Sequence, residues 1–335
     1  MENYQRVNKF KRIKDSFDRV HNYLRLSLTD RCNLRCSYCM PSIPEFVSPK
    51  KLLSADELVT LVSVFTEMGV SKIRLTGGEP LVRKDFTEIA ERIAQFRTSL
   101  HLTTNGFYID RYIDVISRNF NSINISLDTL SAEKFEAISQ KNHFDQIWNN
   151  IDLALTKNIP TKLNVVVIRN SNHDEINDFA ELTINYPLEI RFIEYMPFKG
   201  NEWKISQTYT SQEMLSDIQQ KHKVEFLGRT NNETAEKFRL KDSKGSFGFI
   251  STVSHPFCKG CNRIRVTADG KLKNCLFGTE EYDLIPFLKN SNNLKNEVIR
   301  AFSYKHFSRG GNHLLNGACM ENKQNDSRCM TSIGG

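Results

Sequence analysis

Apolar residues recur with two different periods along the 335-residue chain. Short runs rich in β-branched residues predict six strands, at 23–28, 72–75, 100–103, 123–127, 162–168 and 189–195. Between them, apolar residues three or four positions apart predict amphipathic helices, among them 54–68, 85–96 and 144–157. Ser54 and Glu57 form the pattern of a capping box, so the first of these helices should begin there.

Strands separated by helical crossovers pair in parallel, because each crossover returns the chain to the same end of the sheet. Each conspicuous polar motif directly follows a predicted strand: a cysteine-rich run at 31–41, Thr-Gly-Gly-Glu-Pro at 76–80, Thr-Thr-Asn-Gly at 103–106 and Ser-Leu-Asp at 126–128. Active sites of parallel barrels are built at the carboxyl ends of their strands. We therefore expect an α/β barrel, complete or partial, rather than a flat doubly wound sheet.

This alternation ends near residue 200. Short strands predicted at 223–227, 237–240, 247–253 and 263–266 are separated by polar turns, which favours antiparallel additions beside the barrel. We predict three parts: an N-terminal extension at 1–21, the barrel at 22–200 and a C-terminal region at 201–335.

Composition limits the function classes. A 39% apolar content supports a large core, and no run of about eighteen apolar residues predicts a membrane span. The basic N-terminus lacks the apolar segment of a secretory signal, so we expect a cytoplasmic protein. The net charge of +7 comes without a long Lys/Arg block, which disfavours nucleic acid and leaves a polyanionic substrate open.

Six of the eight cysteines fall into two triplets, which indicates metal ligation because disulfides are rare in the cytosol. Cys32, Cys36 and Cys39 have the spacing C-x3-C-x2-C, which supplies three thiolates to a four-iron, four-sulfur cluster and leaves one iron without a cysteine. An open position is typical of a metal site that does chemistry. A zinc site with a ligand elsewhere, or unconnected buried thiols, is the alternative.

The first triplet resembles the cluster loop of radical S-adenosylmethionine (radical SAM) enzymes. The resemblance implies a partial (βα)6 TIM-type barrel in which the open iron binds the amino and carboxylate groups of SAM and a 5'-deoxyadenosyl radical is released. Gly77-Gly78-Glu79-Pro80 alone predicts only a turn, but in this family it faces the methionine end of SAM, where the Glu79 carboxylate can accept bonds from an ammonium group. The positions that match SAM contacts are Tyr38, Gly78, Ser126 and Met196.

The second triplet consists of Cys258 and Cys261, with Cys275 further along the C-terminal region. By spacing alone, a Cys3His zinc site with His255 and a second iron-sulfur cluster are about equally favoured. We interpret Cys319 and Cys329 as ordinary thiols.

The second triplet, the run 262–267 within it, the first triplet and the terminal Gly334-Gly335 together resemble the GTP 3',8-cyclases of molybdenum cofactor biosynthesis. That resemblance covers nearly the whole chain, and it implies two [4Fe-4S] clusters, the second with its open iron toward the guanine of GTP. The positions that match GTP contacts are Arg25, Arg74, Thr104 (with Thr103 as the alternative), Lys162, Arg263, Ile264 and Arg265. The chain has no P-loop motif, so side chains must bind the triphosphate, and planar guanidinium groups suit it. Two arginines at i and i+2 face the same side of a strand.

The implied reaction takes a hydrogen atom from C3' of GTP and joins that carbon to C8 of guanine, giving (8S)-3',8-cyclo-7,8-dihydroguanosine 5'-triphosphate. Arg263, Arg265, Gly334 and Gly335 are the implied catalytic residues, because in this family the Gly-Gly tail reaches the active site. Expected partners are a reducing electron donor, a downstream cyclic pyranopterin monophosphate synthase and a second copy of the chain in a homodimer. Guanine is implied by the resemblance alone. Two other readings stay open: a peptide-modifying radical SAM enzyme with an auxiliary cluster, and a non-enzymatic zinc or iron-sulfur module.

Overall fold

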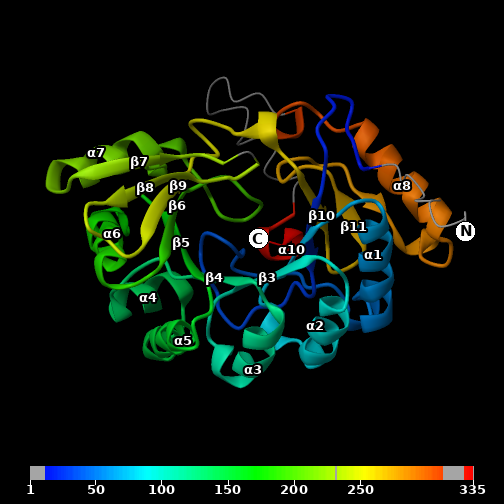
Figure 1. Ribbon diagram of the computed structural model, residues 1–335, viewed down its shortest axis with the longest axis horizontal. Helices are drawn as coiled ribbons and strands as arrows, with labels where there is room; N and C mark the ends of the chain where they lie inside the picture. Colours follow the sequence, from blue (N-terminus) through cyan, green and yellow to red (C-terminus); the bar gives the residue numbers. More distant parts are fainter. Residues whose placement is uncertain (1–11, 231, 312–327, 335) are drawn as a thin grey trace, which may run out of the picture.

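The six predicted strands form the centre of one curved sheet. The computed structural model describes residues 12–230, 232–311 and 328–334, and Figure 1 looks into the open barrel that the sheet makes. The central strands are β1 (Tyr23–Ser27), β2 (Lys72–Thr76), β3 (Ser99–Thr104), β4 (Ser122–Ser126), β5 (Thr161–Val167) and β6 (Glu189–Glu194). Each is parallel to the next, which confirms the predicted α/β barrel.

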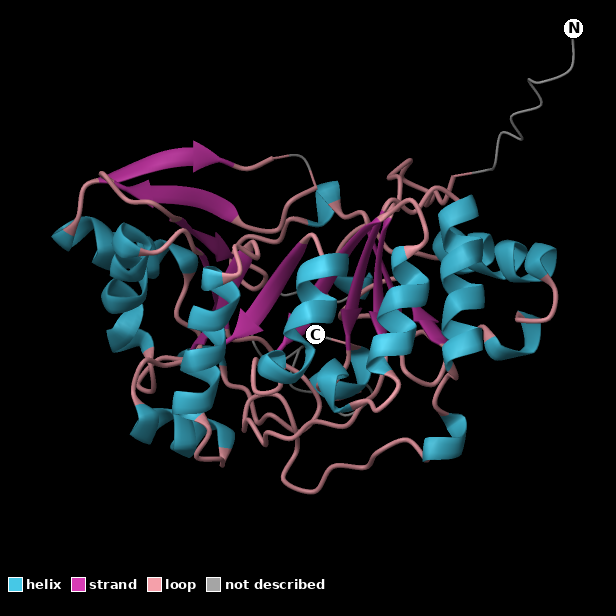
Figure 2. Cartoon of the chain, turned by 60° about the horizontal axis from the view of Figure 1, so that its bottom comes forward, coloured by secondary structure: helices cyan, strands magenta, loops and turns pink. Residues whose placement is uncertain are grey.

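The helices form a layer on the outside of the strands (Figure 2). They are α1 (Ala55–Glu67), α2 (Phe86–Ala94), α3 (Ile109–Asn119), α4 (Ala132–Ser139), α5 (Phe144–Thr156), α6 (Ile176–Asn185), α7 (Ser211–Lys221) and α8 (Ser291–Ser303), with the one-turn α10 (Met330–Ile333) inside the barrel. The predicted capping box of α1 is formed: Glu57 N donates to Ser54 Oγ at 3.2 Å, and Ser54 N donates to Glu57 Oε2 at 2.8 Å. Among the described residues, no helix is long and apolar enough to cross a membrane.

Short 3-10 helices connect several of these elements. They are η1 (Pro49–Lys51), η2 (Pro80–Val82), η3 (His173–Glu175), η4 (Ile205–Gln207), η5 (Cys258–Gly260), η6 (Ile285–Phe287) and η7 (Arg309–Gly311). Two of them, η2 and η5, lie directly at motifs singled out in the sequence, the Gly-Gly turn and the second cysteine triplet.

The C-terminal region adds strands to both edges of the barrel. On one side β9 (Ser246–Ile250) pairs with β6, followed by β8 (Glu236–Leu240) and β7 (Val224–Gly228); on the other, β10 (Arg263–Val266) pairs with β1, followed by β11 (Lys271–Lys273) and β12 (Tyr282–Asp283). The outer pairs are antiparallel as expected, but β9 and β10 join the barrel in parallel. Residues 251–262, which carry two cysteines of the second triplet, therefore connect the two edges of the barrel.

Successive residues of these strands face opposite sides. One set is apolar, unexposed and packed in the main core: Leu24, Leu26, Ile73, Leu75, Ile264 and Val266. The other set faces the inside of the barrel and is polar or charged: Tyr23, Arg25, Lys72, Arg74, Arg263 and Arg265. This alternation decides which side chains can reach a ligand in the barrel.

The described part of the N-terminal extension packs against the C-terminal region. Ile13, Asp15 and His21 are buried. Arg19 pairs with Asp15 at 2.6 Å and donates to Cys258 O at 2.8 Å. Residues 12–21 therefore support the loop of the second triplet, and the predicted three-part division of the chain stays a prediction.

Candidate active site

The first cysteine triplet lies in the loop after β1, at the carboxyl end of the strands. Cys32 Sγ accepts hydrogen bonds from Leu34 N at 3.4 Å and from Asn105 Nδ2 at 3.6 Å. Hydrogen bonds that point at a sulfur favour its negatively charged form. Cys36 O accepts from Cys39 N at 3.0 Å, so the loop turns tightly between the second and third cysteines.

The environment of these thiols fits a positively charged group. Burial, and then the Glu79 carboxylate, raise the pKa of Cys32 to about 11. Burial, Asp128 and the other two thiols raise the pKa of Cys36 as well. Three thiolates can therefore coexist here only beside a positively charged group. A bound metal centre would supply that charge, and thiols that ligate a metal lose their protons.

Across the residues that the structure describes, no three His, Cys, Asp or Glu side chains are placed to hold a single metal ion. A four-iron cluster needs no such point, because its cysteines ligate different corners of the cube. The first triplet therefore fits a [4Fe-4S] cluster, with Cys32, Cys36 and Cys39 as the residues that would hold it.

Gly77 and Gly78 let the turn after β2 approach the cluster loop. A Cβ would lie 2.4 Å from Thr29 O at Gly77 and 2.5 Å from Arg31 O at Gly78, so neither position accepts a side chain. Gly78 N also donates to Thr29 O at 2.7 Å. The two glycines thus hold the backbone that leads into Cys32.

Glu79 is fully buried, and its carboxylate is occupied by the protein. Its oxygens accept hydrogen bonds from Thr104 Oγ1 at 2.8 Å and from Asn105 N at 2.6 Å. A carboxylate has about four acceptor positions, so the expected contact of Glu79 with an ammonium group stays a prediction. The bond to Glu79 directs the Thr104 hydroxyl away from the barrel, whereas Thr103 Oγ1 accepts from Arg74 Nη1 at 3.4 Å. Of the two threonines, Thr103 is the one beside the basic side chains.

Four arginines, hereafter the arginine layer, lie on three adjacent strands: Arg25 on β1, Arg74 on β2, and Arg263 and Arg265 on β10. The strand register places Arg25 opposite both Arg74 and Arg265. Arg74 is 2% exposed, and Arg263 and Arg265 are each 9% exposed. Sequence reasoning predicted this set, and the structure brings all four together.

Three members of the arginine layer, Arg74, Arg263 and Arg265, have no carboxylate partner among the described residues. No ion pair within the described residues includes Arg74, Arg263 or Arg265, although Glu189 and Glu281 pair with lysines and arginines elsewhere in the barrel wall. Arg263 Nη1 and Arg265 Nε are buried without a hydrogen-bond partner. Buried charges are normally paired, so this arrangement is typical of an anion site.

The pKa of Tyr23 shows how strongly the neighbouring cations act on a buried acidic group. Its hydroxyl accepts from Arg74 Nε at 2.6 Å. Burial raises the pKa of Tyr23, but Arg74, Arg25 and Lys72 outweigh burial and bring it down to about 7. The cations therefore attract even a phenolate.

Lys162 differs from the arginines because it already has a carboxylate partner. Its Nζ lies 2.5 Å from Glu189 Oε2, and Arg191 Nε contacts the other oxygen of Glu189 at 2.5 Å. Burial, and then Arg191, lower the pKa of Lys162 to about 8. A GTP contact by Lys162 would have to share or replace this pair.

The second triplet lies beside the arginine layer. Burial raises the pKa of Cys261, but Arg263 and Lys305 outweigh it and bring it down to about 6. Cys275 also lies near Arg265, and its thiolate favours the charged form of Arg265. His255, the alternative zinc ligand, is exposed and bonds to Ser254 Oγ at 3.1 Å.

Three residues at predicted SAM positions line the region between the cluster loop and β6. Tyr38 donates to Asp128 Oδ2 at 2.7 Å, and Ser126 is the last residue of β4. Met196 is 7% exposed and packs in a second apolar cluster that Tyr38 borders. This second apolar cluster is formed by Tyr195, Met196, Phe198, Trp203, Val253 and Ile333.

The C-terminal tail enters the same region. Ile333 is 1% exposed within the second apolar cluster. A Cβ on Gly334 would lie 2.5 Å from Thr76 Oγ1 and 3.2 Å from Ser27 Cβ, so Gly334 sits against the carboxyl ends of β1 and β2. Gly335 lies outside the described residues.

Some positions were misjudged or missed in the sequence. The side chain of Ile264 lies in the core, on the face opposite the arginines, so only its backbone is on the ligand side. Tyr23 was missed as an interior residue. It stands two residues before Arg25 on β1, and that spacing was the available signal. Thr103 was the alternative to Thr104, and it lies two residues beyond His101, the partner of Arg74 on β3.

An open parallel barrel with a three-cysteine loop at its mouth defines a protein of the radical SAM class, and residues 26–183 match the family model described as "Radical SAM superfamily". Residues 188–311 match the model "Molybdenum Cofactor Synthesis C". A GTP 3',8-cyclase of Desulforamulus reducens is 38% identical over 331 residues, covering 96% of this chain and 99% of that protein. The chain therefore belongs to the GTP 3',8-cyclase family of molybdenum cofactor biosynthesis. Membership in the radical SAM superfamily implies a [4Fe-4S] cluster and SAM.

Other relatives are longer. The mitochondrial GTP 3',8-cyclase of Arabidopsis thaliana is 43% identical over 81% of this chain and 71% of its own length. Molybdenum cofactor biosynthesis protein 1 of Drosophila melanogaster is 41% identical over 86% of this chain, which spans about half of that protein. Among solved structures, Streptococcus suis SuiB bound to S-adenosylmethionine matches with a TM-score of 0.60 at 14% identity, over 76% of this chain and 60% of that one. That likeness shows the fold alone.

Proposed function

We propose that this chain cyclises GTP to (8S)-3',8-cyclo-7,8-dihydroguanosine 5'-triphosphate. When bound, the first cluster and SAM supply the 5'-deoxyadenosyl radical that takes hydrogen from C3' of the ribose. The observation that carries the proposal is the arginine layer, in which Arg74, Arg263 and Arg265 are buried at the barrel wall without a carboxylate partner among the described residues.

The arginine layer suits a triphosphate in both charge and geometry. Guanidinium groups donate parallel hydrogen bonds to phosphate oxygens, and these bonds strengthen where water is excluded. Arg263 and Arg265 project from the same face of β10, while Arg25 and Arg74 continue that face onto β1 and β2. Thr103, rather than Thr104, is the hydroxyl placed to add a contact beside Arg74.

The second triplet, next to Arg263 and Arg265, is proposed to hold a second [4Fe-4S] cluster that faces the guanine. The lowered pKa of Cys261 supports metal ligation at neutral pH, because the thiolate is the ligating form. A zinc site at the same cysteines is the competing possibility, and metal analysis separates the two. Two four-iron clusters require about eight irons per chain.

The tail is proposed to complete the site. Ile333 packs in the second apolar cluster, which Tyr38 of the cysteine loop borders, and Gly334 lies against the ends of β1 and β2. In these positions the two residues would exclude water from the barrel. A dry site strengthens the charge contacts and protects a reactive carbon radical from side reactions. Tyr38, Gly78, Ser126 and Met196 are the proposed SAM positions.

The test is substrate selection by the loaded enzyme. Anaerobically reconstituted, reduced protein is mixed with SAM and each of the four nucleoside triphosphates, and 5'-deoxyadenosine and cyclised nucleotide are measured. Both products are expected with GTP. Deoxyadenosine without a cyclised nucleotide, or an equal response to all four triphosphates, would contradict the proposal.

The partners are proposals that rest on the family. They are an electron donor that reduces the first cluster, a cyclic pyranopterin monophosphate synthase that consumes the product, and a second copy of the chain in a homodimer. Sedimentation analysis of the cluster-loaded protein tests the homodimer directly, and a monomer at working concentration would exclude it. The predicted cytoplasmic location stays a prediction.

A further inference from the structure

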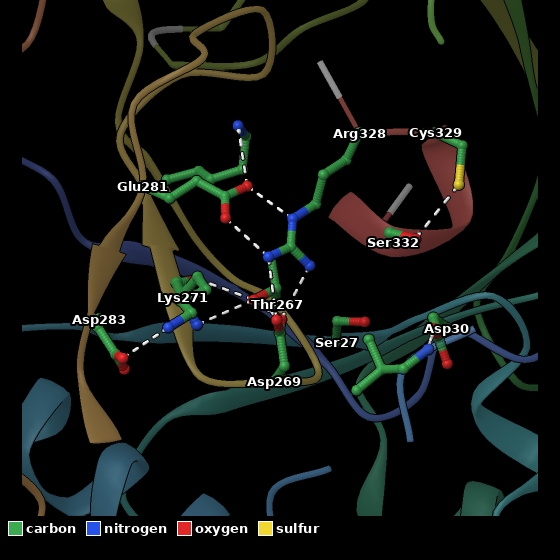
Figure 3. A network of polar contacts seen from close by, with 12 residues as sticks. Ser27, Asp30, Thr267, Asp269, Lys271, Glu281, Asp283, Arg328, Cys329 and Ser332 are labelled. Carbon is green, nitrogen blue, oxygen red and sulfur yellow. Dashed lines mark hydrogen bonds and ion pairs between the residues drawn. The ribbon is translucent and has the colours of Figure 1, made fainter. Parts of the chain in front are cut away.

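Arg328 joins the C-terminal tail to the barrel wall through two carboxylates (Figure 3). Its Nε and Nη2 donate to the two oxygens of Glu281, each at 2.7 Å. Its Nη1 and Nη2 donate to the two oxygens of Asp269 at 2.9 and 3.0 Å. Both contacts are bidentate, the geometry in which a guanidinium binds a carboxylate with the most strength and direction.

The two carboxylates are themselves held in place. Asp269 Oδ1 accepts a second bond from Thr267 Oγ1 at 2.6 Å, and Lys273 Nζ lies 3.5 Å from Glu281 Oε1. Asp269 lies in the turn between β10 and β11, and Glu281 directly precedes β12. The side chains of Arg328, Asp269 and Glu281 are 24%, 16% and 22% exposed, so water and salt screen this contact less than an open surface pair.

Arg328 makes all the hydrogen bonds and ion pairs that join residues 328–334 to the rest of the described chain. Beyond it, the single turn of α10 leads to Ile333 in the second apolar cluster and to Gly334 against Ser27 and Thr76. Apolar packing alone is not directional. The bidentate contacts therefore define where the tail enters.

We propose that Arg328 is a positioning residue, whose contact with Asp269 and Glu281 fixes the tail so that Gly334 stays at the ends of β1 and β2. The same contact ties the tail to the β10–β11 hairpin, which carries Arg263 and Arg265 of the arginine layer. Arg328 acts through the tail and touches none of the proposed substrate positions. A small displacement of a group in an active site costs much of its effect. The consequence for turnover rests on the proposed function, whereas the anchoring of the tail does not.

The experiment compares full-length, cluster-loaded Arg328→Ala and Arg328→Lys with the parent protein. Arg92→Ala is the matched control, because Arg92 on α2 also pairs with two carboxylates, those of the exposed residues Asp56 and Glu88. Amide hydrogen exchange at 330–334, measured without GTP, should be about tenfold or more faster in Arg328→Ala, the loss expected for charged hydrogen bonds. Arg328→Lys should give an intermediate rate, because a lysine keeps the positive charge but cannot donate two parallel hydrogen bonds to one carboxylate. Arg92→Ala should leave this exchange unchanged.

Turnover is the second readout. In Arg328→Ala, kcat for GTP cyclisation should fall about tenfold or more, with iron content and SAM affinity unchanged. Unchanged exchange at 330–334 overturns the proposal whatever the activity. Faster exchange with unchanged cyclisation also overturns the positioning role.

Two further cases are an inactive parent protein and an Arg328→Ala variant that does not fold. If the parent protein does not cyclise GTP at all while the exchange responds as expected, the proposed function fails and the anchoring stands. If Arg328→Ala does not fold, Glu281→Gln removes one charge at nearly constant volume, and its exchange at 330–334 takes the place of that measurement.

Discussion

Arg25 and Arg265 lie opposite each other on the neighbouring parallel strands β1 and β10, although they come from opposite ends of the sequence. Burial, followed by repulsion from neighbouring arginines, lowers the pKa of both, to about 10 for Arg25 and about 9 for Arg265. Two like charges brought together in a buried strand pair repel each other, and a bound anion would reduce that repulsion.

Replacing Arg265 should separate stability from substrate binding. Arg265→Met removes a buried, repelled charge, so we expect the free energy of unfolding of the GTP-free protein to rise by about 1 kcal/mol. GTP affinity should fall about tenfold or more, because charged hydrogen bonds to phosphate are lost. Chemical denaturation and equilibrium binding measure the two effects. A variant that loses stability but keeps its GTP affinity would show that Arg265 is structural.

Thr103→Val and Thr104→Val test which threonine faces the substrate. Thr103→Val should weaken GTP binding about threefold to tenfold without changing stability, the value of one hydrogen bond. Thr104→Val removes a donor to the buried Glu79 carboxylate and should lower stability by about 1–3 kcal/mol. Each variant is the control for the other in thermal unfolding and GTP titration, and the opposite pattern would reverse the assignment.

Tyr23 should make the stability of the GTP-free protein depend on pH. Its pKa is about 7 in the folded protein, against about 10 for an unperturbed tyrosine. Since the folded-state pKa is depressed, the phenolate adds no stability below about pH 7; its contribution grows as pH rises toward 10 and is lost again as pH falls. Tyr23→Phe should remove this slope, measured as the free energy of unfolding across that range together with tyrosinate absorption. Superimposable curves for both proteins would disprove the assignment.

The tail predicts two effects at its terminal glycines. Deleting Gly334 and Gly335 should leave folding and both proposed clusters intact and abolish cyclisation. Gly334→Ala should act in the same direction, because the new Cβ would lie 2.5 Å from Thr76 Oγ1. Gly228→Ala is the matched control: its φ of +89° resembles the +81° of Gly334, but no atom lies within 4 Å of the added carbon. A fully active deletion protein would remove the tail from the mechanism.

The second triplet predicts a distinct metal content. Cys258→Ala should reduce iron from about eight to about four atoms per chain and leave cleavage of SAM intact while GTP cyclisation is lost. Cys329→Ala is the control, because Cys329 is proposed to ligate no cluster. Iron and zinc are counted after anaerobic purification. Zinc in the parent protein, lost in Cys258→Ala, would favour the Cys3His alternative.

Strand positions and the cysteine loop were predictable because their signals are local. The β-branched runs predicted both ends of β1 to β6 to within one residue, and the capping box of α1 is formed as Ser54 and Glu57 predicted. The partners of Glu79 were not predictable. Thr104 ends β3 and Asn105 follows it, and the sequence does not say how closely the ends of two neighbouring strands approach.

The sequence by itself determined the chemistry available to this protein: two incomplete cysteine triplets, arginines within apolar strands and a terminal Gly-Gly. These depend on residue type and spacing. Only the tertiary structure decided that β10 lies beside β1 and that Arg328 ties the tail to Asp269 and Glu281. Such contacts join segments far apart in the chain, and the packing of the whole sheet, which no local pattern records, sets their geometry.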